Sequence, residues 1–135
     1  MEMEKIIMNT PPYKILIIDD EEEVLKAIQM TIKRNKLFNS EITTALNTEN
    51  ALSALENHFY DLVLSDYKMP NVNGIEFIKT VMEKSPQTIR ILITGYSDAN
   101  VAQEAINKHY AHNYIDKPWD NDELVSIVHT ALLNR

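Results

Sequence analysis

The sequence predicts a single α/β domain with a doubly wound, five-stranded parallel sheet. The chain has 135 residues, a length that suits one domain with one core. Short apolar runs of strand length alternate with segments long enough for amphipathic helices. Parallel strands need crossover connections of about this length, so we expect helices to connect successive strands and to pack on the sheet.

Composition excludes several classes of protein. Apolar residues make up 44% of the chain and charged residues 24%, as in ordinary globular domains. The net charge of −7 argues against direct nucleic-acid binding, which needs clustered Lys and Arg. Because the chain has no cysteine, it has neither disulfides nor a thiolate metal site. Its N-terminal residues do not resemble a signal peptide, and no apolar stretch approaches the roughly 18 residues of a membrane helix. We therefore expect a cytoplasmic domain with no membrane partner.

The first half of the chain predicts three strands and two helices. Residues 1–12 are expected to form a loosely held arm that ends at Pro11-Pro12, and the domain is expected to occupy residues 13–135. β-branched and apolar runs predict strands at residues 13–18, 40–46 and 62–64. Capping residues predict one helix after Asp20, with Glu23 three residues on and Val24 on its inner face, and another from Thr48 to about His58.

The second half predicts two further strands and three helices. A loop is expected after the third strand, because Pro70 and Gly74 interrupt any regular pattern, and a helix follows Gly74. Another helix is expected to start at Ser97 or Asp98. The remaining elements are strands at residues 89–93 and 113–115 and a final helix at about 120–133.

Polar side chains follow four of these strands. Asp19 and Asp20 follow the first, Asp66 the third, Thr94 the fourth and Lys117 the fifth. Ligands of open α/β sheets bind at the carboxyl ends of the strands, so we expect these five residues to converge. Three neighbouring carboxylates raise one another's pKa unless a cation intervenes, and Mg²⁺ with oxygen ligands would relieve that repulsion. A nucleophilic carboxylate, a metal, an ammonium and a hydroxyl are together the parts of an aspartyl phosphate site.

This pattern resembles the receiver domain of two-component response regulators, and the resemblance runs from about Tyr13 to Leu133. It implies a flavodoxin-like (βα)5 fold with strand order 2-1-3-4-5, as in the chemotaxis receiver. The motifs that carry it are Asp19-Asp20 after an apolar strand, Asp66-Tyr67-Lys68-Met69-Pro70 with Gly74, Thr94-Gly95 and Lys117-Pro118.

The resemblance implies a chemical role for each residue of the predicted site. Asp66 resembles the phosphoacceptor, which takes a phosphoryl group from a histidine kinase or a phosphotransfer protein. Asp19 and Asp20 resemble the acidic pair that holds Mg²⁺, with Asp66 and the backbone carbonyl of Lys68 as further ligands. Lys117 resembles the lysine that pairs with the phosphoryl group. These roles make the domain a signalling phosphoacceptor, not an enzyme with a dissociable substrate.

The resemblance also implies a switch. Thr94 matches the hydroxyl that moves toward the phosphoryl group, and Tyr114 matches the aromatic residue that turns inward when it does. The surface formed by residues 98–133 would then bind an output domain or a second receiver. Lys68 and Tyr96 occupy positions that border the phosphoryl group, and we expect Tyr96 to shield the aspartyl phosphate from water.

Simpler interpretations remain open for each residue taken singly. Asp20 could serve only as a helix cap, Asp66 as a cap or a buried ion pair, and Tyr114 as ordinary packing. Two alternative functions also remain. One is a small Mg²⁺-dependent phosphatase or phosphotransferase that forms an aspartyl phosphate, although the adjacent pair Asp19-Asp20 does not match the haloacid-dehalogenase pattern. The other is an unphosphorylated interaction module on the same fold.

Overall fold

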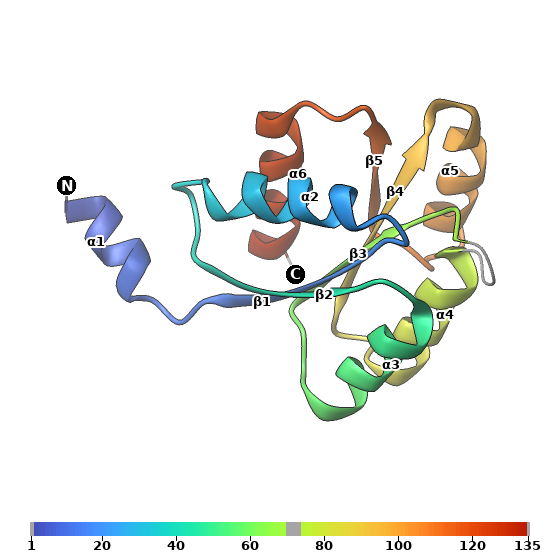
Figure 1. The fold of residues 1–135 in the computed structure, drawn as a ribbon, viewed down its shortest axis with the longest axis horizontal. Helices are drawn as coiled ribbons and strands as arrows, with labels where there is room; N and C mark the ends of the chain where they lie inside the picture. Colours follow the sequence, from blue (N-terminus) through green and yellow to red (C-terminus); the bar gives the residue numbers. More distant parts are fainter. Residues whose placement is uncertain (1, 70–73, 135) are drawn as a thin grey trace.

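A computed structural model describes residues 2–69 and 74–134. In these residues a five-stranded parallel sheet runs through the centre of the domain in the order β2-β1-β3-β4-β5 (Figure 1). The predicted fold class and strand order are thereby confirmed. The strands are β1 (Tyr13–Ile18), β2 (Ser40–Ala45), β3 (Leu62–Asp66), β4 (Ile89–Gly95) and β5 (Asn113–Lys117).

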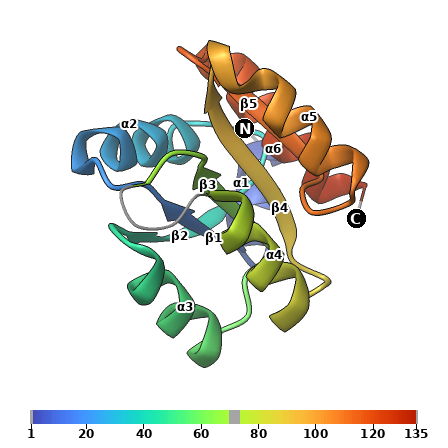
Figure 2. The ribbon, with the colours of Figure 1, turned by 90° about the vertical axis from the view of Figure 1, so that its right-hand side faces the viewer.

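Helices cover both faces of this sheet. α2 and α6 pack on one face, and α3, α4 and α5 pack on the other. Figure 2 shows α2 on the opposite side of the sheet from α3 and α4. In the described part of the chain, no helix has the length and apolar character that crossing a membrane requires. The helices are α1 (Glu2–Asn9), α2 (Glu22–Lys33), α3 (Thr48–Asn57), α4 (Gly74–Lys84), the 3-10 turn η1 (Tyr96–Asp98), α5 (Ala99–Asn107) and α6 (Asn121–Leu133).

Two apolar layers hold the helices to the sheet. β3 is buried along its whole length, so its side chains contribute to both layers in alternation. Leu62 and Leu64 belong to the layer under α2 and α6, whereas Val63 belongs to the layer under α3, α4 and α5. A strand buried on both faces explains why the apolar runs of the sequence are continuous.

The starts of α2 and α3 differ from the prediction. Asp20 is not the N-cap of α2; that position belongs to Glu21, and in the described residues no side chain caps this end. The turn before the helix is held instead by Asp19, whose Oδ1 accepts the backbone N–H of Glu21 at 2.8 Å. Thr48 begins α3 but does not cap it, because Asn47 accepts the N–H of Asn50 at 2.8 Å. Asn and Thr are both common caps, so sequence alone does not choose between adjacent candidates.

Other inner faces and boundaries shift by a residue or so. The buried side of α2 consists of Leu25, Ile28 and Ile32, with Val24 only half-buried. Ser97 and Asp98 form the turn η1, and α5 starts at Ala99. The loop expected around Pro70 lies outside the described residues between 69 and 74.

The segment predicted as a loosely held arm contains a helix that the sequence analysis did not predict. α1 projects away from the body of the domain and joins β1 through Thr10 and Pro11-Pro12 (Figure 1). Its side chains Met3 and Ile6 are 67% and 60% exposed. The domain therefore leaves these two apolar side chains of α1 uncovered.

Candidate functional site

The parallel register gathers the predicted site residues at the carboxyl edge of the sheet. Asp66 is the last residue of β3 and pairs with Ile93 on β4. Lys117 is the last residue of β5 and pairs with Gly95, directly after Thr94. Asp19 continues from the end of β1, whose neighbour in the sheet is β3. Four strands therefore bring their polar ends to one place.

The carboxylates of Asp19, Asp20 and Asp66 form an acidic cluster at this edge. One oxygen from each lies within 4.8 Å of the others. Asp19 is 1% exposed and Asp66 is 5% exposed, whereas Asp20 is exposed to solvent. Buried carboxylates this close together repel one another and need a compensating positive charge.

Lys117 supplies one such charge. Its Nζ lies 2.8 Å from Oδ1 of Asp66 and 3.8 Å from Oδ2 of Asp19. Partial burial by itself would lower the pKa of Lys117, but the hydrogen bond and negative charge of Asp66 outweigh it, helped by the charge of Asp19, so the pKa is raised. The ammonium therefore stays charged and bound to Asp66.

One lysine does not balance the whole cluster. The pKa of Asp19 is raised from 3.8 to about 6, chiefly by burial and further by the negative charges of Asp66 and Asp20. The hydrogen bond from the Glu21 N–H and the positive charge of Lys117 lower this pKa but do not cancel the rise. In the described residues, Oδ2 of Asp19 is buried and has no hydrogen-bond partner. A buried carboxylate oxygen without a donor, beside two further carboxylates, fits a hard divalent cation with oxygen ligands.

Thr94 holds a second unsatisfied group. Its side chain is fully buried, and its Oγ1 has no hydrogen-bond partner in the described part of the chain. Leu92 and Tyr114 are paired across β4 and β5, and Thr94 follows Leu92 by two residues. Thr94 and Tyr114 therefore lie on the same face of the sheet. Tyr114 is half-buried there, packed against the layer under α3, α4 and α5.

The chain after Asp66 folds tightly back onto the strand end. The Tyr67 N–H donates to the Ile93 carbonyl at 2.9 Å, and the Gly74 N–H donates to the Tyr67 carbonyl at 2.6 Å. A Cβ at position 74 would lie 2.3 Å from the carbonyl oxygen of Asp66. Only glycine permits this approach. In the sequence Gly74 is a loop signal and part of the receiver-like motif, but neither predicts its contact with the Asp66 carbonyl.

An ion pair that the sequence did not predict joins the segments that follow two of the site strands. Lys68 Nζ lies 3.6 Å from Oδ2 of Asp98, with Lys68 72% and Asp98 16% exposed. The pair links the segment after β3 to the turn η1 after β4. Tyr96 is the first residue of that turn, and its side chain lies outside the described part of the structure. Nothing in the local spacing indicates that Lys68 and Asp98 meet.

Comparisons with known proteins agree on one family. The model of the response regulator receiver domain matches residues 15–129. The hydrogenase transcriptional regulatory protein HoxA of Cupriavidus necator is 30% identical over 118 residues, which cover 87% of this chain and 24% of that protein. The regulatory protein AtoC of Escherichia coli is 35% identical over 119 residues, covering 88% of this chain and 25% of that protein. The chain thus spans about a quarter of the length of these curated relatives.

A solved structure shows the same likeness in three dimensions. The signal receiver domain of an HD domain-containing protein from Pseudomonas fluorescens Pf-5 superposes with a TM-score of 0.81 at 29% identity, covering 91% of this chain and 96% of that one. The family model covers most of the sheet and reaches all four polar strand ends, so the sequence match and the fold agree. The chain therefore belongs to the receiver domains of two-component response regulators.

Proposed function

We propose that this receiver accepts a phosphoryl group on Asp66 from the phosphohistidine of a histidine kinase or a phosphotransfer protein. The observation that carries the proposal is the surroundings of Asp66. Its carboxylate is buried at a strand end, 2.8 Å from the Lys117 ammonium and within 4.8 Å of two further carboxylates. A carboxylate in this setting is a poor structural group and a suitable nucleophile toward phosphorus.

The acidic cluster supports a requirement for Mg²⁺. Asp19, Asp20 and Asp66 would hold the ion, together with the backbone carbonyl of Lys68. Bound there, Mg²⁺ would supply positive charge to the phosphoryl oxygens and lessen the repulsion between the carboxylates. The structural observation that favours this assignment is Oδ2 of Asp19, which is buried without a hydrogen bond in the described residues and has the Lys117 ammonium only at 3.8 Å.

The transfer itself uses side chains of this chain. An Asp66 oxygen attacks phosphorus, a P–O bond forms as the P–N bond breaks, and the electron pair of that bond returns to the imidazole of the donor. Lys117 exchanges its contact with Asp66 for one with a phosphoryl oxygen, where its charge opposes the developing negative charge. Thr94 Oγ–H, which has no partner in the described residues, donates to another phosphoryl oxygen.

The Thr94 movement would open space for Tyr114 on the same face of the sheet. A local charge change would thereby bias the surface formed by α5, β5 and α6 between two packings. We infer that this surface contacts an output domain, in this or another chain, or a second receiver. Because relatives such as HoxA are named as transcriptional regulators, we favour an output domain that controls transcription.

Exposure to Mg²⁺ with acetyl phosphate or beryllofluoride tests the proposal. The wild-type chain is expected to gain one phosphoryl group on Asp66, measured by intact mass, and beryllofluoride is expected to change the fluorescence of the half-buried Trp119. Asp66→Asn should do neither, whereas Asp116→Asn, an exposed carboxylate on the same strand end as Lys117, should respond like the wild type. An unresponsive wild type, or an equal response in Asp66→Asn, would contradict the proposal. Turnover of a free phosphoester would favour the phosphatase instead.

A further inference from the structure

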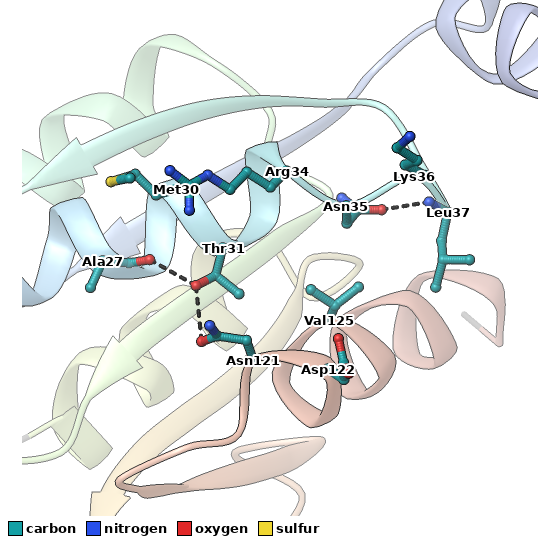
Figure 3. Close-up of a pocket in the computed structure, with 10 residues that line it drawn as sticks. All are labelled: Ala27, Met30, Thr31, Arg34, Asn35, Lys36, Leu37, Asn121, Asp122 and Val125. Atoms are coloured by element: carbon teal, nitrogen blue, oxygen red, sulfur yellow. Dashed lines mark hydrogen bonds between the residues drawn. The ribbon is translucent and has the colours of Figure 1, made fainter.

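A groove of about 730 Å³ lies between α2 and α6, away from the acidic cluster (Figure 3). Its apolar lining comes from Ala27, Met30, Leu37 and Val125, and its charged lining from Arg34, Lys36 and Asp122, two positive charges and one negative. A hydrogen bond from Thr31 Oγ1 to Asn121 Oδ1, 3.2 Å long, ties the two helices together at one end. The groove therefore combines an apolar lining with a small excess of positive charge.

Four of the seven exposed large apolar side chains of the described residues lie on α1 or in this groove. The other three are Leu46, Phe59 and Leu133. The α1 pair is Met3 and Ile6, and the groove pair is Met30, 49% exposed, and Leu37, 53% exposed. Uncovered apolar side chains concentrated on a helix and in a groove are typical of surfaces that bind each other.

α1 carries Glu2, Glu4 and Lys5, a net charge of −1, whereas the groove carries Arg34, Lys36 and Asp122, a net charge of +1, so the two net charges are opposite in sign. Residues three and four apart lie on the same side of a helix, which places Met3 and Ile6 together with Glu2 at their flank. An α1 helix laid in the groove would bring Glu2 toward Arg34 and Lys36, while Met3 and Ile6 would cover Met30 and Leu37.

The connection to β1 directs α1 outward from its own domain. Thr10, the residue after α1, is bound through its carbonyl by Asn39 Nδ2 at 3.3 Å. Pro11-Pro12 then restricts the backbone to an extended path into β1. In Figure 3 the ribbon of α1 lies outside the groove, beyond its Lys36 end. A helix held outward from the rim of one groove is placed to enter the groove of a neighbour.

We propose that two copies of this chain associate by exchanging α1, each helix docking in the α2–α6 groove of the other copy. The exchange is reciprocal, so it closes as a two-fold dimer and covers both helices and both grooves. The groove shares α6 with the α5–β5–α6 face but contains no residue of α5 or β5, and the exchange does not depend on phosphorylation of Asp66.

Cross-linking between different chains tests the docking directly, since the natural chain has no cysteine. One chain carries Ile6→Cys and a mass tag, and the other carries Leu37→Cys. Mild oxidation of the mixture is expected to give a disulfide-linked heterodimer. The control chain carries Leu46→Cys, which is similarly exposed, at 46%, but lies at the far end of β2. A heterodimer yield no higher than with this control would overturn the proposal, as would a disulfide formed only within one chain carrying both substitutions.

Sedimentation of the full chain provides an independent measurement. Ile6→Glu should weaken self-association at least about tenfold, because it puts a charge into the apolar contact. Phe59→Glu changes another exposed apolar residue, 49% exposed and outside the groove, and should associate like the wild type. The response to beryllofluoride should be retained in both variants, which shows that the domain is folded. A monomeric wild type at all concentrations, or equal association of Ile6→Glu, would refute the exchange.

Discussion

At the scale of single residues, the unphosphorylated site carries groups that its own neighbours do not satisfy. Oγ1 of Thr94 and Oδ2 of Asp19 are buried without hydrogen-bond partners among the described residues. Each such group costs about 1–3 kcal/mol of stability. Strain of this kind is common at functional sites, because the missing partner arrives with the ligand or the modification.

Thr94→Val should therefore stabilise the unphosphorylated domain. It replaces an unpartnered hydroxyl by a methyl group of similar size, so we expect a gain of about 1 kcal/mol in the free energy of unfolding, measured with urea. The same variant should lose the Trp119 fluorescence response to beryllofluoride. Thr94→Ser, which keeps the hydroxyl, should retain that response; a destabilised Thr94→Val would show that the hydroxyl has a partner in the unphosphorylated state.

The raised pKa of Asp19 predicts how stability depends on pH. A carboxyl whose pKa rises from 3.8 to about 6 on folding contributes stability below pH 3.8, and this is lost as pH rises through about 6. The loss amounts to about 3 kcal/mol. In EDTA, the free energy of unfolding of Asp19→Asn relative to the wild type should therefore increase by up to about that amount from pH 4 to pH 7. Urea unfolding of both proteins at both pH values measures this difference.

Two controls accompany the Asp19 experiment. Asp116→Asn, an exposed change on the same edge, should show no such pH-dependent gain. Added Mg²⁺ should stabilise the wild type more than Asp19→Asn, because a cation replaces the proton. If the stabilities of Asp19→Asn and the wild type run parallel with pH, Asp19 is ionised without cost and the interpretation fails.

At the scale of elements, the connections between strands hold the site in shape. The turn after β3 packs Gly74 against the backbone of Asp66. At the opposite end of β4, the buried Arg90 guanidinium donates to carbonyls in the two segments that precede β4 and β5, and the Arg90 carbonyl accepts the His112 N–H at 2.7 Å. The carbonyls that accept from Arg90 belong to Pro86, Thr88, His109 and Tyr110. These hydrogen bonds hold the loop before β5 against β4, a contact that neither Arg90 nor His112 indicates in the sequence.

Gly74→Ala should disturb the site through the backbone of the phosphoacceptor. The added Cβ, 2.3 Å from the Asp66 carbonyl oxygen, forces a shift that we expect to cost about 1–3 kcal/mol and to slow phosphorylation by acetyl phosphate. Gly95→Ala is the matched control, because its Cβ would meet its nearest atom, Asp98 Oδ2, at an ordinary 3.7 Å. Equal unfolding free energies and phosphorylation rates for the two variants would rule out this role of Gly74.

At the scale of the whole molecule, the central sheet couples two apolar layers into one cooperative unit. Trp119 packs against the layer under α2 and α6, whereas Ile78 of α4 is fully buried in the other layer. Both layers share β1, β3 and β4, so neither can melt while the other remains intact. A single unfolding transition follows from that arrangement.

Ile78→Ala tests this coupling across the sheet. The cavity should cost about 2–5 kcal/mol, and Trp119 fluorescence and far-UV circular dichroism should report the same shifted urea midpoint. Glu83→Ala, an exposed change on the same helix, should move the unfolding free energy by no more than about 0.5 kcal/mol. A Trp119 transition that stays in place while the circular dichroism transition shifts would show that the layers unfold separately.

The sequence by itself determined the fold class, the strand order through its family resemblance, and the residues that end four of the strands. The strands and helices follow from the periodicity of neighbouring residues. The common location of the strand ends follows from the general rule that the carboxyl ends of parallel strands meet at one edge of the sheet. Tertiary structure alone decided which carboxylate is buried: Asp19 turns into the site and binds the Glu21 N–H, while Asp20 stays exposed. It also decided that Lys68 meets Asp98 and that α1 stands clear of the domain. The physical reason is that the burial of Asp19 and the meeting of Lys68 with Asp98 depend on how segments distant in sequence pack together, which no local pattern records.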